Sequence, residues 1–412
     1  MLPFPIIVLS LVFLLTAFRQ VFFRKLRIWQ IMSLGASTVI LAGQIGVVDA
    51  AKAVNTDVML FLFGMFVIGS ALEESGYLSF ISYRLFRKAP SADALLLSIL
   101  FGSGIASAFL LNDTLAIIGT PIVLLLAKKH GMNAKPLILA LCFSVTIGSV
   151  MSPIGNPQNL LIAVNGNVER PFTTFFSLLL VPTMINLLLA YCVLKLSYPQ
   201  DFGKRKLNHS EEKISDNALA SLSKTSLAIV ISTVFLKIVS GFLAPAFDFK
   251  LTYIALLAMV PVLLSPRRTE IIRKSDWRTL VFFTSMFILM ESVWETGFFQ
   301  SVIYSINLDV KSVPMIFFVG VGLSQLISNV PLASLYLPIL MHAGAGAKEL
   351  VSLAAASTIG GNLFILGAAS NVIIIQNAER KNETITFFEF AKVGIPLTAI
   401  NIFVYWFFLS VI

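Results

Sequence analysis

Charged side chains are scarce in this sequence, in which Asp, Glu, Lys and Arg together make up 12% of 412 residues. Soluble proteins contain about twice that fraction. Apolar residues make up 57% and the mean hydropathy is +0.89, so a soluble chain of this composition could not cover its surface with polar groups. Apolar stretches long enough to cross a bilayer recur along the whole length. The sequence therefore predicts an all-α polytopic protein of the cell membrane, with the lipid bilayer as its surroundings.

Cysteine and histidine are also rare, with two and three residues respectively. Cys142 and Cys192 both lie in apolar stretches, so neither a disulfide framework nor a cysteine metal site is expected. The histidines show no metal-ligand spacing. The sequence contains no nucleophile elbow and no phosphate-binding loop, which argues against a membrane enzyme. We therefore expect no catalytic residues, no metal and no organic cofactor.

Positive charge is in excess, with a formal net charge of +9, but its placement does not favour a nucleic-acid partner. The basic residues form short clusters between apolar stretches, a pattern that places the clusters in the cytoplasm. If residues 84–88 and 128–135 lie on the same side of the membrane, 24 of the 30 Lys and Arg residues fall in cytoplasmic loops and five in outer loops. This threading predicts an N-terminus outside the cell and a polar cytoplasmic linker over 197–224.

Plain membrane spans alternate with interrupted ones. The hydropathy pattern predicts uninterrupted spans at about 3–18, 28–50, 57–76, 172–195, 225–243, 251–265, 277–297 and 393–411. Residues 92–127 and 313–343 are too long for one helix and are broken at their centres, which predicts two re-entrant hairpins. Residues 136–165 and 350–376 contain SPIGNPQN and LGAASN, which predicts two broken helices. Because non-helical backbone survives in a membrane only against protein or a water-filled cavity, the four breaks should line one polar cavity.

The two halves of the sequence resemble each other at three places in the same order. The matched pairs are 65–76 with 286–297, 111–124 with 328–341, and 147–159 with 359–371. With the first hairpin opening inward and the second outward, the repeat is inverted. Inverted repeats are typical of secondary transporters, whose binding site lies at the repeat interface near the bilayer midplane.

The helix ends at these breaks carry the chemistry of a binding site. Helix N-termini favour an anion, whereas freed carbonyls with Asn and Ser oxygens favour Na⁺ or a proton carrier. Gly155 and Gly367 are expected to permit close backbone approach and an unusual φ. The alternative is that the Asn and Ser side chains only cap broken helices. The predicted substrate- and ion-binding residues are Asn112, Asp113, Thr114, Gly155, Asn156, Gln158, Asn159, Ser328, Asn329, Gly367, Ser370 and Asn371.

Asp113 is the only carboxylate at any of the four breaks, and we predict that it couples transport to protons. A carboxylate at the centre of a membrane helix costs about 2.5–3.5 kcal/mol on insertion scales, so it is rarely retained without a role. Apolar surroundings favour the protonated acid, and the N-terminus of a following helix favours the carboxylate. These opposing effects would allow proton binding on one side and release on the other. The alternative is that Asp113 caps that helix.

Four motifs resemble the ion transporter superfamily, which includes arsenical pump membrane proteins, NhaD-type sodium/proton antiporters and divalent-anion:sodium symporters. They are NDTLAIIGTPIVLLL, IGSVMSPIGNPQNLLIA, SNVPLASLYLPIL and ILGAASN, and they look most similar to the arsenical-pump-like branch. The symporters carry Ser-Asn-Thr at both hairpin tips, whereas this sequence has Asn112-Asp113-Thr114 and Ser328-Asn329-Val330. This departure argues against sodium-coupled dicarboxylate uptake.

The resemblance implies a transport domain, formed by the hairpins and broken helices, that slides like an elevator against a dimeric scaffold. We accordingly expect a homodimer. The predicted segments are scaffold helices and a first arm over 1–91, the first half of the transport domain over 92–165, scaffold helices with the linker and a second arm over 166–312, the second half of the transport domain over 313–376, and a C-terminal scaffold helix over 377–412.

The predicted function is ion-coupled secondary transport of a small anion or oxyacid, with arsenite- or antimonite-like efflux coupled to protons as the leading interpretation. No Arg lies at any break to bind a carboxylate or phosphate through two hydrogen bonds, which favours a small or neutral substrate over a citrate-like dianion. Na⁺/H⁺ exchange and sodium-coupled symport of a carboxylate or inorganic anion are the alternatives. An ion channel is a remote one, because the paired hairpins favour alternating access over a continuous pore.

Overall fold

The computed structural model describes residues 2–22, 26–86, 89–202, 207, 214–243, 250–298, 301, 310–327 and 329–411. In these ranges the chain folds as α-helices, with one 3₁₀ turn, η1 (Ile365–Gly367). Helices long and apolar enough to cross a bilayer are α4 (Thr56–Glu74), α10 (Pro171–Ser197), the segment Asn217–Leu236 of α11 (Asn217–Leu243), and α20 (Phe387–Val411). Shorter apolar helices lie between them, so the chain is built as an all-helical protein with several candidate membrane spans.

Most helices follow the hydropathy pattern, but the predicted span over 28–50 is wrong. In the structure α2 (Ile28–Leu41) ends before a turn, and the short α3 (Val47–Ala53) follows it. Gly43 in this turn has φ +67, a left-handed conformation that suits glycine. The predicted linker over 197–224 is also shorter than expected, because α11 already begins at Asn217, where the Asp216 carboxylate accepts a hydrogen bond from the backbone N–H of Leu219.

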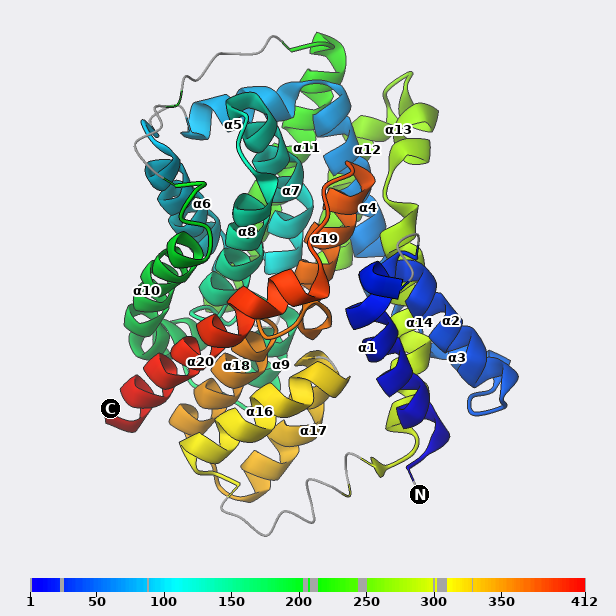
Figure 1. The fold of residues 1–412 in the computed structure, drawn as a ribbon, viewed down its shortest axis with the longest axis vertical. Helices are drawn as coiled ribbons and strands as arrows, with labels where there is room; N and C mark the ends of the chain where they lie inside the picture. Colours follow the sequence, from blue (N-terminus) through cyan, green and yellow to red (C-terminus); the bar gives the residue numbers. More distant parts are fainter. Residues whose placement is uncertain are drawn as a thin grey trace.

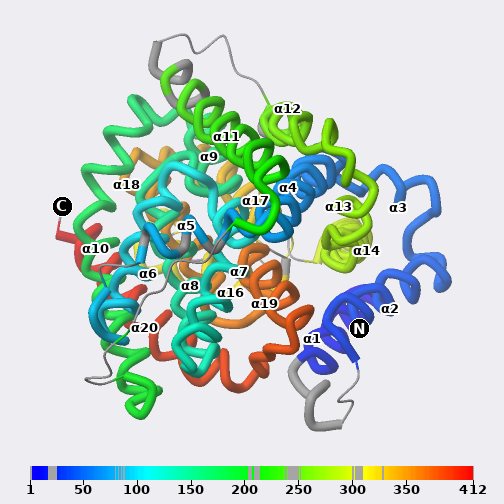
Figure 2. The backbone as a smooth tube through the Cα atoms, turned by 90° about the horizontal axis from the view of Figure 1, so that it is seen from above, coloured from blue at the N-terminus to red at the C-terminus, as the bar shows by residue number. Residues whose placement is uncertain are grey.

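The helices form two groups. One group, here called the panel, consists of α1 (Phe4–Phe22), α2, α3, α4, α11, α12 (Leu251–Leu263), α13 (Arg268–Lys274) and α14 (Trp277–Trp294). The other group, here called the bundle, consists of α6 (Ala92–Ser107), α7 (Asn112–His130), α8 (Ala134–Ser149), α9 (Pro157–Asn165), α10, α16 (Val313–Ile327), α17 (Asn329–His342), α18 (Ala347–Gly360), α19 (Ala369–Arg380) and α20. Helix α5 (Tyr77–Phe86) joins them. Figure 2 shows α1, α2, α3 and α14 on one side and α6, α10 and α20 on the other.

The packing of α10 and α20 differs from the predicted segments, which placed both helices in the scaffold. Helix α10 packs against α6, α8 and α20, and α20 also packs against α18. Between α10 and α20, the hydroxyls of Thr183 and Tyr405 lie 2.7 Å apart, and Asn401 Nδ2 donates to Asn186 Oδ1 at 2.9 Å. All four side chains are buried, and such polar contacts hold membrane helices together. The packing therefore places α10 and α20 in the bundle, so the boundaries at 166 and 377 do not divide the two groups.

Helices α6 and α7 are joined by a turn over residues 108–111. At the start of α6, Asp93 forms an ion pair of 3.0 Å with Lys195, near the end of α10. Just before α8, Asn133 Nδ2 donates to Asp201 Oδ2 at 3.2 Å, shortly after the end of α10. The chain thus enters α6 and leaves α7 beside the same end of α10.

Both predicted helix breaks are present. Helix α8 ends at Ser149 and α9 begins at Pro157, while α18 ends at Gly360 and α19 begins at Ala369, with η1 between them. The matched glycines Gly76 and Gly297 follow the ends of α4 and α14 with φ +75 and +66, so both terminate a helix in the left-handed conformation. In Figure 1 the α16–α17 pair lies at the lower end of the molecule, whereas α5 and α13 lie at its upper end.

Candidate substrate site

The tip of the first hairpin is bonded directly to the first helix break. The backbone N–H of Asn112, the first residue of α7, donates to the carbonyl oxygen of Gly155 at 2.9 Å. Leu111 immediately before it has φ +44 and ψ 133, a conformation that residues with a side chain rarely adopt. Strained backbone of this kind persists only where the surrounding contacts enforce it. The hairpin tip is therefore held in one position against the break.

Gly155 is required for space rather than for its backbone angle. A Cβ atom at this position would lie 2.2 Å from the carbonyl oxygen of Ser149 and 2.7 Å from its Cα. A Cβ atom at Gly367 would be less crowded, because it would lie 2.7 Å from Gln325 Oε1 and 3.1 Å from atoms of Gly361. Neither glycine has a positive φ, so the predicted unusual φ is wrong, while the close backbone approach is observed at both.

Two matched asparagines close the two breaks in the same way. Asn159 Nδ2 donates to the carbonyl of Ser149 at 3.1 Å, and Asn371 Nδ2 donates to the carbonyl of Gly361 at 2.8 Å. In each case the acceptor lies ten residues earlier, where the preceding helix ends. Asn159 also reaches the carbonyls of Val150 and Ser152. Carbonyls left free by the interruption are thereby paired, as buried backbone groups must be.

Thr358 joins the two halves of the site. It lies near the end of α18, and its hydroxyl accepts hydrogen bonds from Asn156 Nδ2 at 3.1 Å and Gln158 Nε2 at 3.3 Å, and donates to Asn159 Oδ1 at 3.2 Å. Asn156 also accepts a hydrogen bond from the backbone N–H of Asn159 at 2.8 Å and so caps α9. Three of the predicted site residues of the first half are thus fixed by one hydroxyl of the second half. Sequence analysis missed Thr358 because it lies in the helix before the predicted break, outside the LGAASN motif.

The second hairpin tip reaches both sides of the second break, at Ser357 of α18 and at Gly367 of η1. The side-chain nitrogen of Asn329 lies 3.0 Å from the carbonyl oxygen of Ser357 and 3.1 Å from that of Gly367, in the amide orientation that pairs it with both. Asn112 and Asn329 therefore bond to Gly155 and Gly367, the matched glycines of their own halves. Gln325 on α16, which sequence analysis also missed, donates from Nε2 to the carbonyl of Gly360 at 2.6 Å. Ser328 lies outside the described residues.

Several buried oxygens at the tips and breaks have no hydrogen-bond partner in the described part of the chain. They are Asn112 Oδ1, Asp113 Oδ1, Gln325 Oε1, Asn362 Oδ1, Ser370 Oγ and Asn371 Oδ1, and the amide nitrogen of Asn362 is unpaired as well. Amide and carboxylate oxygens only accept hydrogen bonds unless they are protonated. Leaving such groups buried and unpaired is costly, so they point to water, an ion or a substrate as the missing partner. A partner that donates protons or carries positive charge would suit this set.

Comparison with known proteins places the chain in a family. The family model described as a citrate transporter, CitMHS, matches residues 11–360. The chain belongs to the citrate transporter family. Members of this family are secondary transporters and not enzymes, so the chain is a multi-pass membrane transporter that moves a small substrate across a bilayer.

Similar proteins carry different names. An uncharacterized transporter of Mycobacterium tuberculosis, Rv2684, is 25% identical over 85% of this chain and 84% of its own length. The silicon efflux transporter LSI3 of Oryza sativa subsp. japonica is 27% identical over 89% of both chains. The transporter arsB of Dictyostelium discoideum is 22% identical over 90% and 85%. Among solved structures, the YdaH transporter of Alcanivorax borkumensis matches with TM-score 0.49 and 14% identity over 99% of this chain and 98% of that chain.

In this citrate transporter family member, Asp113 does not cap a helix. Helix α7 begins at Asn112, its N-cap residue is Leu111, and no side chain forms the capping hydrogen bond. Asp113 lies in the first turn, half-buried, with one carboxylate oxygen unpaired, and the neighbouring Thr114 is buried. The capping role considered from the sequence is therefore not observed, and Asp113 Oδ1 has no hydrogen-bond partner in the described part of the chain.

We expect Thr358→Val to impair transport by this citrate transporter family member more than its small volume change suggests. Valine would leave the amides of Asn156 and Gln158 short of one acceptor each, and an unpaired buried polar group costs about 1–3 kcal/mol. Substrate exchange in proteoliposomes should fall, with a raised KM, because the polar lining loses its fixed positions. Thr358→Ser keeps the hydroxyl and should exchange normally. Equal exchange by both variants would show that Thr358 does not organise the site.

Proposed function

We propose that this chain exports a small, uncharged oxyacid such as arsenite or antimonite in exchange for protons. The observation that supports it best is the set of unpaired buried oxygens at the tips and breaks, on Asn112, Asp113, Gln325, Asn362, Ser370 and Asn371. An uncharged oxyacid presents hydroxyl donors to such acceptors. The described tip and break residues include no Lys or Arg, which a multiply charged anion would require for compensation.

The names of relatives agree with this substrate class. The rice relative is named a silicon efflux transporter. Dissolved silicon and arsenite are both hydroxy acids that are uncharged near neutral pH, so both would present O–H donors. Citrate, from which the family takes its description, is instead a polyanion that would meet the unpaired oxygens with charge of the same sign.

We further propose that transport proceeds by movement of the bundle against the panel. Three observations support an inverted-repeat mechanism: Asn159 and Asn371 close both breaks identically, Gly155 and Gly367 receive the two hairpin tips, and the two ends of the α6–α7 hairpin lie beside one end of α10. A bonded unit of this kind moves as one body. In this proposal α10 and α20 travel with the hairpins, because buried polar pairs join them to each other.

The orientation we propose places the ends of the α6–α7 hairpin and residues 197–216 in the cytoplasm, following the basic clusters. We expect a cysteine at Lys129, near the end of α7, to react with a membrane-impermeant maleimide only in inside-out vesicles. Labelling in intact cells would contradict this orientation, because it would make the first hairpin a true crossing.

The test of the proposed function is flux by the purified protein in proteoliposomes. With arsenite inside and an acidic exterior, we expect saturable arsenite efflux that collapses when the pH gradient is dissipated. Excess external citrate should not compete. Citrate uptake without arsenite flux would overturn the proposal, and an ohmic current without saturation would indicate a channel.

Na⁺/H⁺ exchange is the second candidate, and the same unpaired oxygens favour it, because amide and carboxylate oxygens are ligands for Na⁺. Proteoliposomes with an acidic interior and no arsenite separate the two. Sodium uptake driven by an outward proton gradient, in the absence of arsenite, would support exchange of the two cations, whereas strict dependence on arsenite would exclude it.

A further inference from the structure

The end of α19 is tied to the panel by charged side chains. Lys381, directly after α19, forms an ion pair with Glu73 of α4. Arg380, the last residue of α19, donates from Nη2 to the backbone carbonyl of Lys274 at 2.5 Å, and its Nη1 lies 3.9 Å from the buried carboxylate of Asp276. The panel residues come from α4 and from the α13–α14 corner, whereas α19 belongs to the bundle. These contacts therefore cross the seam between the two groups.

The panel side of this seam carries an ion-pair cluster of its own. Glu74 forms ion pairs with Lys274 at 2.7 Å and with Arg267 at 3.4 Å, and Glu270 bonds to both of these basic residues. Hydrogen bonds from Arg267 and then Lys274 lower the pKa of Glu270 to about 2. This carboxylate therefore stays ionised throughout the physiological pH range. The α13–α14 corner thus offers fixed acceptors to Arg380.

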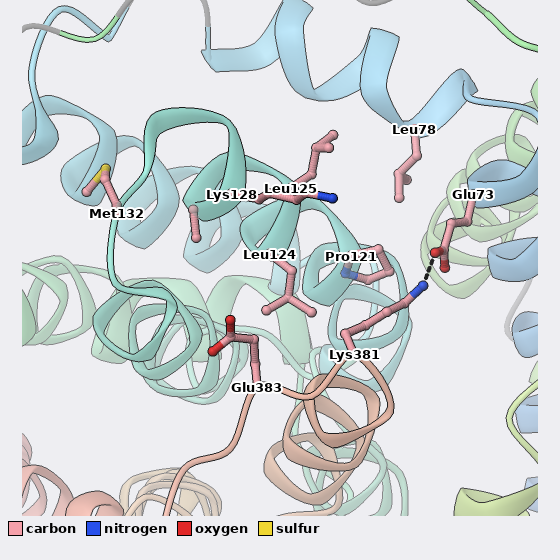
Figure 3. Close-up of a pocket in the computed structure, with 10 residues that line it drawn as sticks. Glu73, Leu78, Pro121, Leu124, Leu125, Lys128, Met132, Lys381 and Glu383 are labelled. Atoms are coloured by element: carbon pink, nitrogen blue, oxygen red, sulfur yellow. Dashed lines mark hydrogen bonds and ion pairs between the residues drawn. The ribbon is translucent and has the colours of Figure 1, made fainter.

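A cavity of about 400 Å³ lies beside the Glu73–Lys381 pair (Figure 3). Its lining includes Glu73, Lys381 and the face of α7 from Pro121 to Lys128. The first turn of α7 carries the proposed coupling residue Asp113, and the cavity is lined by the second half of the same helix. The ion pair stands on the wall of this cavity, where the bundle meets the panel.

Helix α19 links these contacts to the site. Its first turn carries Ser370 and Asn371, and its last residue is Arg380. Its 12 residues span about 18 Å, and a helix transmits displacement along its axis with little bending. Any movement of the second break is therefore passed to the end of α19, where it must stretch or break the contacts with Glu73, Lys274 and Asp276.

We propose that Arg380 and Lys381, with Glu73, Lys274 and Asp276 as their partners, form the inner gate of the transport path. This inference rests on the proposed movement of the bundle against the panel. In the arrangement described here the gate is closed and restricts passage from the cavity to Asp113. It opens when the bundle moves, because its two sides belong to different groups.

The experiment measures access along α7 without any substrate. Ile117 is buried on α7 between the cavity and Asp113, so a cysteine there, in a Cys192→Ser background, reports access to the path. In inside-out vesicles, the double variant Arg380→Gln with Lys381→Gln should react with a hydrophilic maleimide several-fold faster than the parent. A charge-swap variant with Glu73→Lys and Lys381→Glu keeps an ion pair at this place with the two charges exchanged. Its labelling rate should equal that of the parent.

Lys195→Gln is the matched control. The Lys195 side chain is as exposed as that of Lys381, at 45%, and it forms an ion pair with Asp93, but both partners lie within the bundle. It should leave the labelling rate unchanged. Unchanged labelling in the double variant, or an equal increase with Lys195→Gln, would overturn the gate. Because no substrate is used, this result is independent of whether arsenite, sodium or citrate is transported.

Discussion

Asp113→Asn should abolish proton-driven transport while leaving the fold intact. Asparagine has nearly the shape of aspartate, but its side-chain amide cannot bind and release a proton at the pH of the experiment. Because no capping hydrogen bond from Asp113 is present, the variant loses only the favourable charge in the first turn of α7, about 0.3–1 kcal/mol. Efflux of arsenite under a pH gradient should fall to the level of protein-free vesicles, measured as arsenic released with time.

Exchange of substrate for substrate distinguishes coupling from binding. If Asp113 carries the proton, exchange of labelled for unlabelled arsenite with no pH gradient should survive in the Asn variant. Asp113→Glu keeps a titratable group and should retain part of the proton-driven flux. Proton-driven efflux at the parent rate in Asp113→Asn, with normal expression, would remove Asp113 from the mechanism.

Gly155→Ala should inactivate the transporter by distorting the first break. The added Cβ would meet the backbone of Ser149 at 2.2 Å, and backbone cannot rotate away as a side chain can. Overpacking typically costs roughly 1–3 kcal/mol, and here the shift would also displace the carbonyl that accepts from Asn112. We expect a lower unfolding temperature together with loss of exchange as well as of proton-driven flux, in contrast to Asp113→Asn.

Two other glycines provide the controls for this change. Gly102 in α6 is exposed, and a Cβ there would meet nothing within 4 Å, so Gly102→Ala should be neutral or stabilising by about 0.5–1 kcal/mol. Gly367→Ala should be intermediate, because its nearest neighbour is the movable side chain of Gln325. Normal exchange by Gly155→Ala would show that the break tolerates expansion and would refute the close-approach argument.

The breaks could be predicted because polar residues, proline and glycine interrupt apolar stretches that are otherwise long enough to span a membrane. SPIGNPQN and LGAASN lie where the chain leaves the helical conformation in the structure. The equivalence of Asn159 and Asn371 could also be predicted, because the two residues occupy matched positions in the internal repeat. At both breaks the residues that interrupt the helix are themselves visible in the sequence, so the backbone conformation follows from a short local motif.

Contacts between distant segments could not be predicted in this way. Thr358 and Gln325 lie in apolar helices whose pattern does not distinguish a binding residue from one that only bonds within its helix. Membership of α10 and α20 in the bundle depends on which neighbours Asn186 and Asn401 meet, and an uninterrupted span gives no indication of that. The gate residues at the end of α19 resemble ordinary interfacial charges until their partners on α4 and the α13–α14 corner are known.

The order of the helices has a consequence for how far the bundle can travel. The chain passes between the panel and the bundle three times, through α5, through residues 198–216 and through residues 295–312. Helix α5 has a fixed length of about 15 Å over its ten residues and follows Gly76 in its left-handed conformation, so it can pivot but not lengthen. Residues 198–216 can extend by at most about 3.3–3.6 Å each. In the proposed movement these connections limit the stroke of the bundle, and shortening 198–216 should reduce that stroke while every contact in the proposed substrate site remains in place.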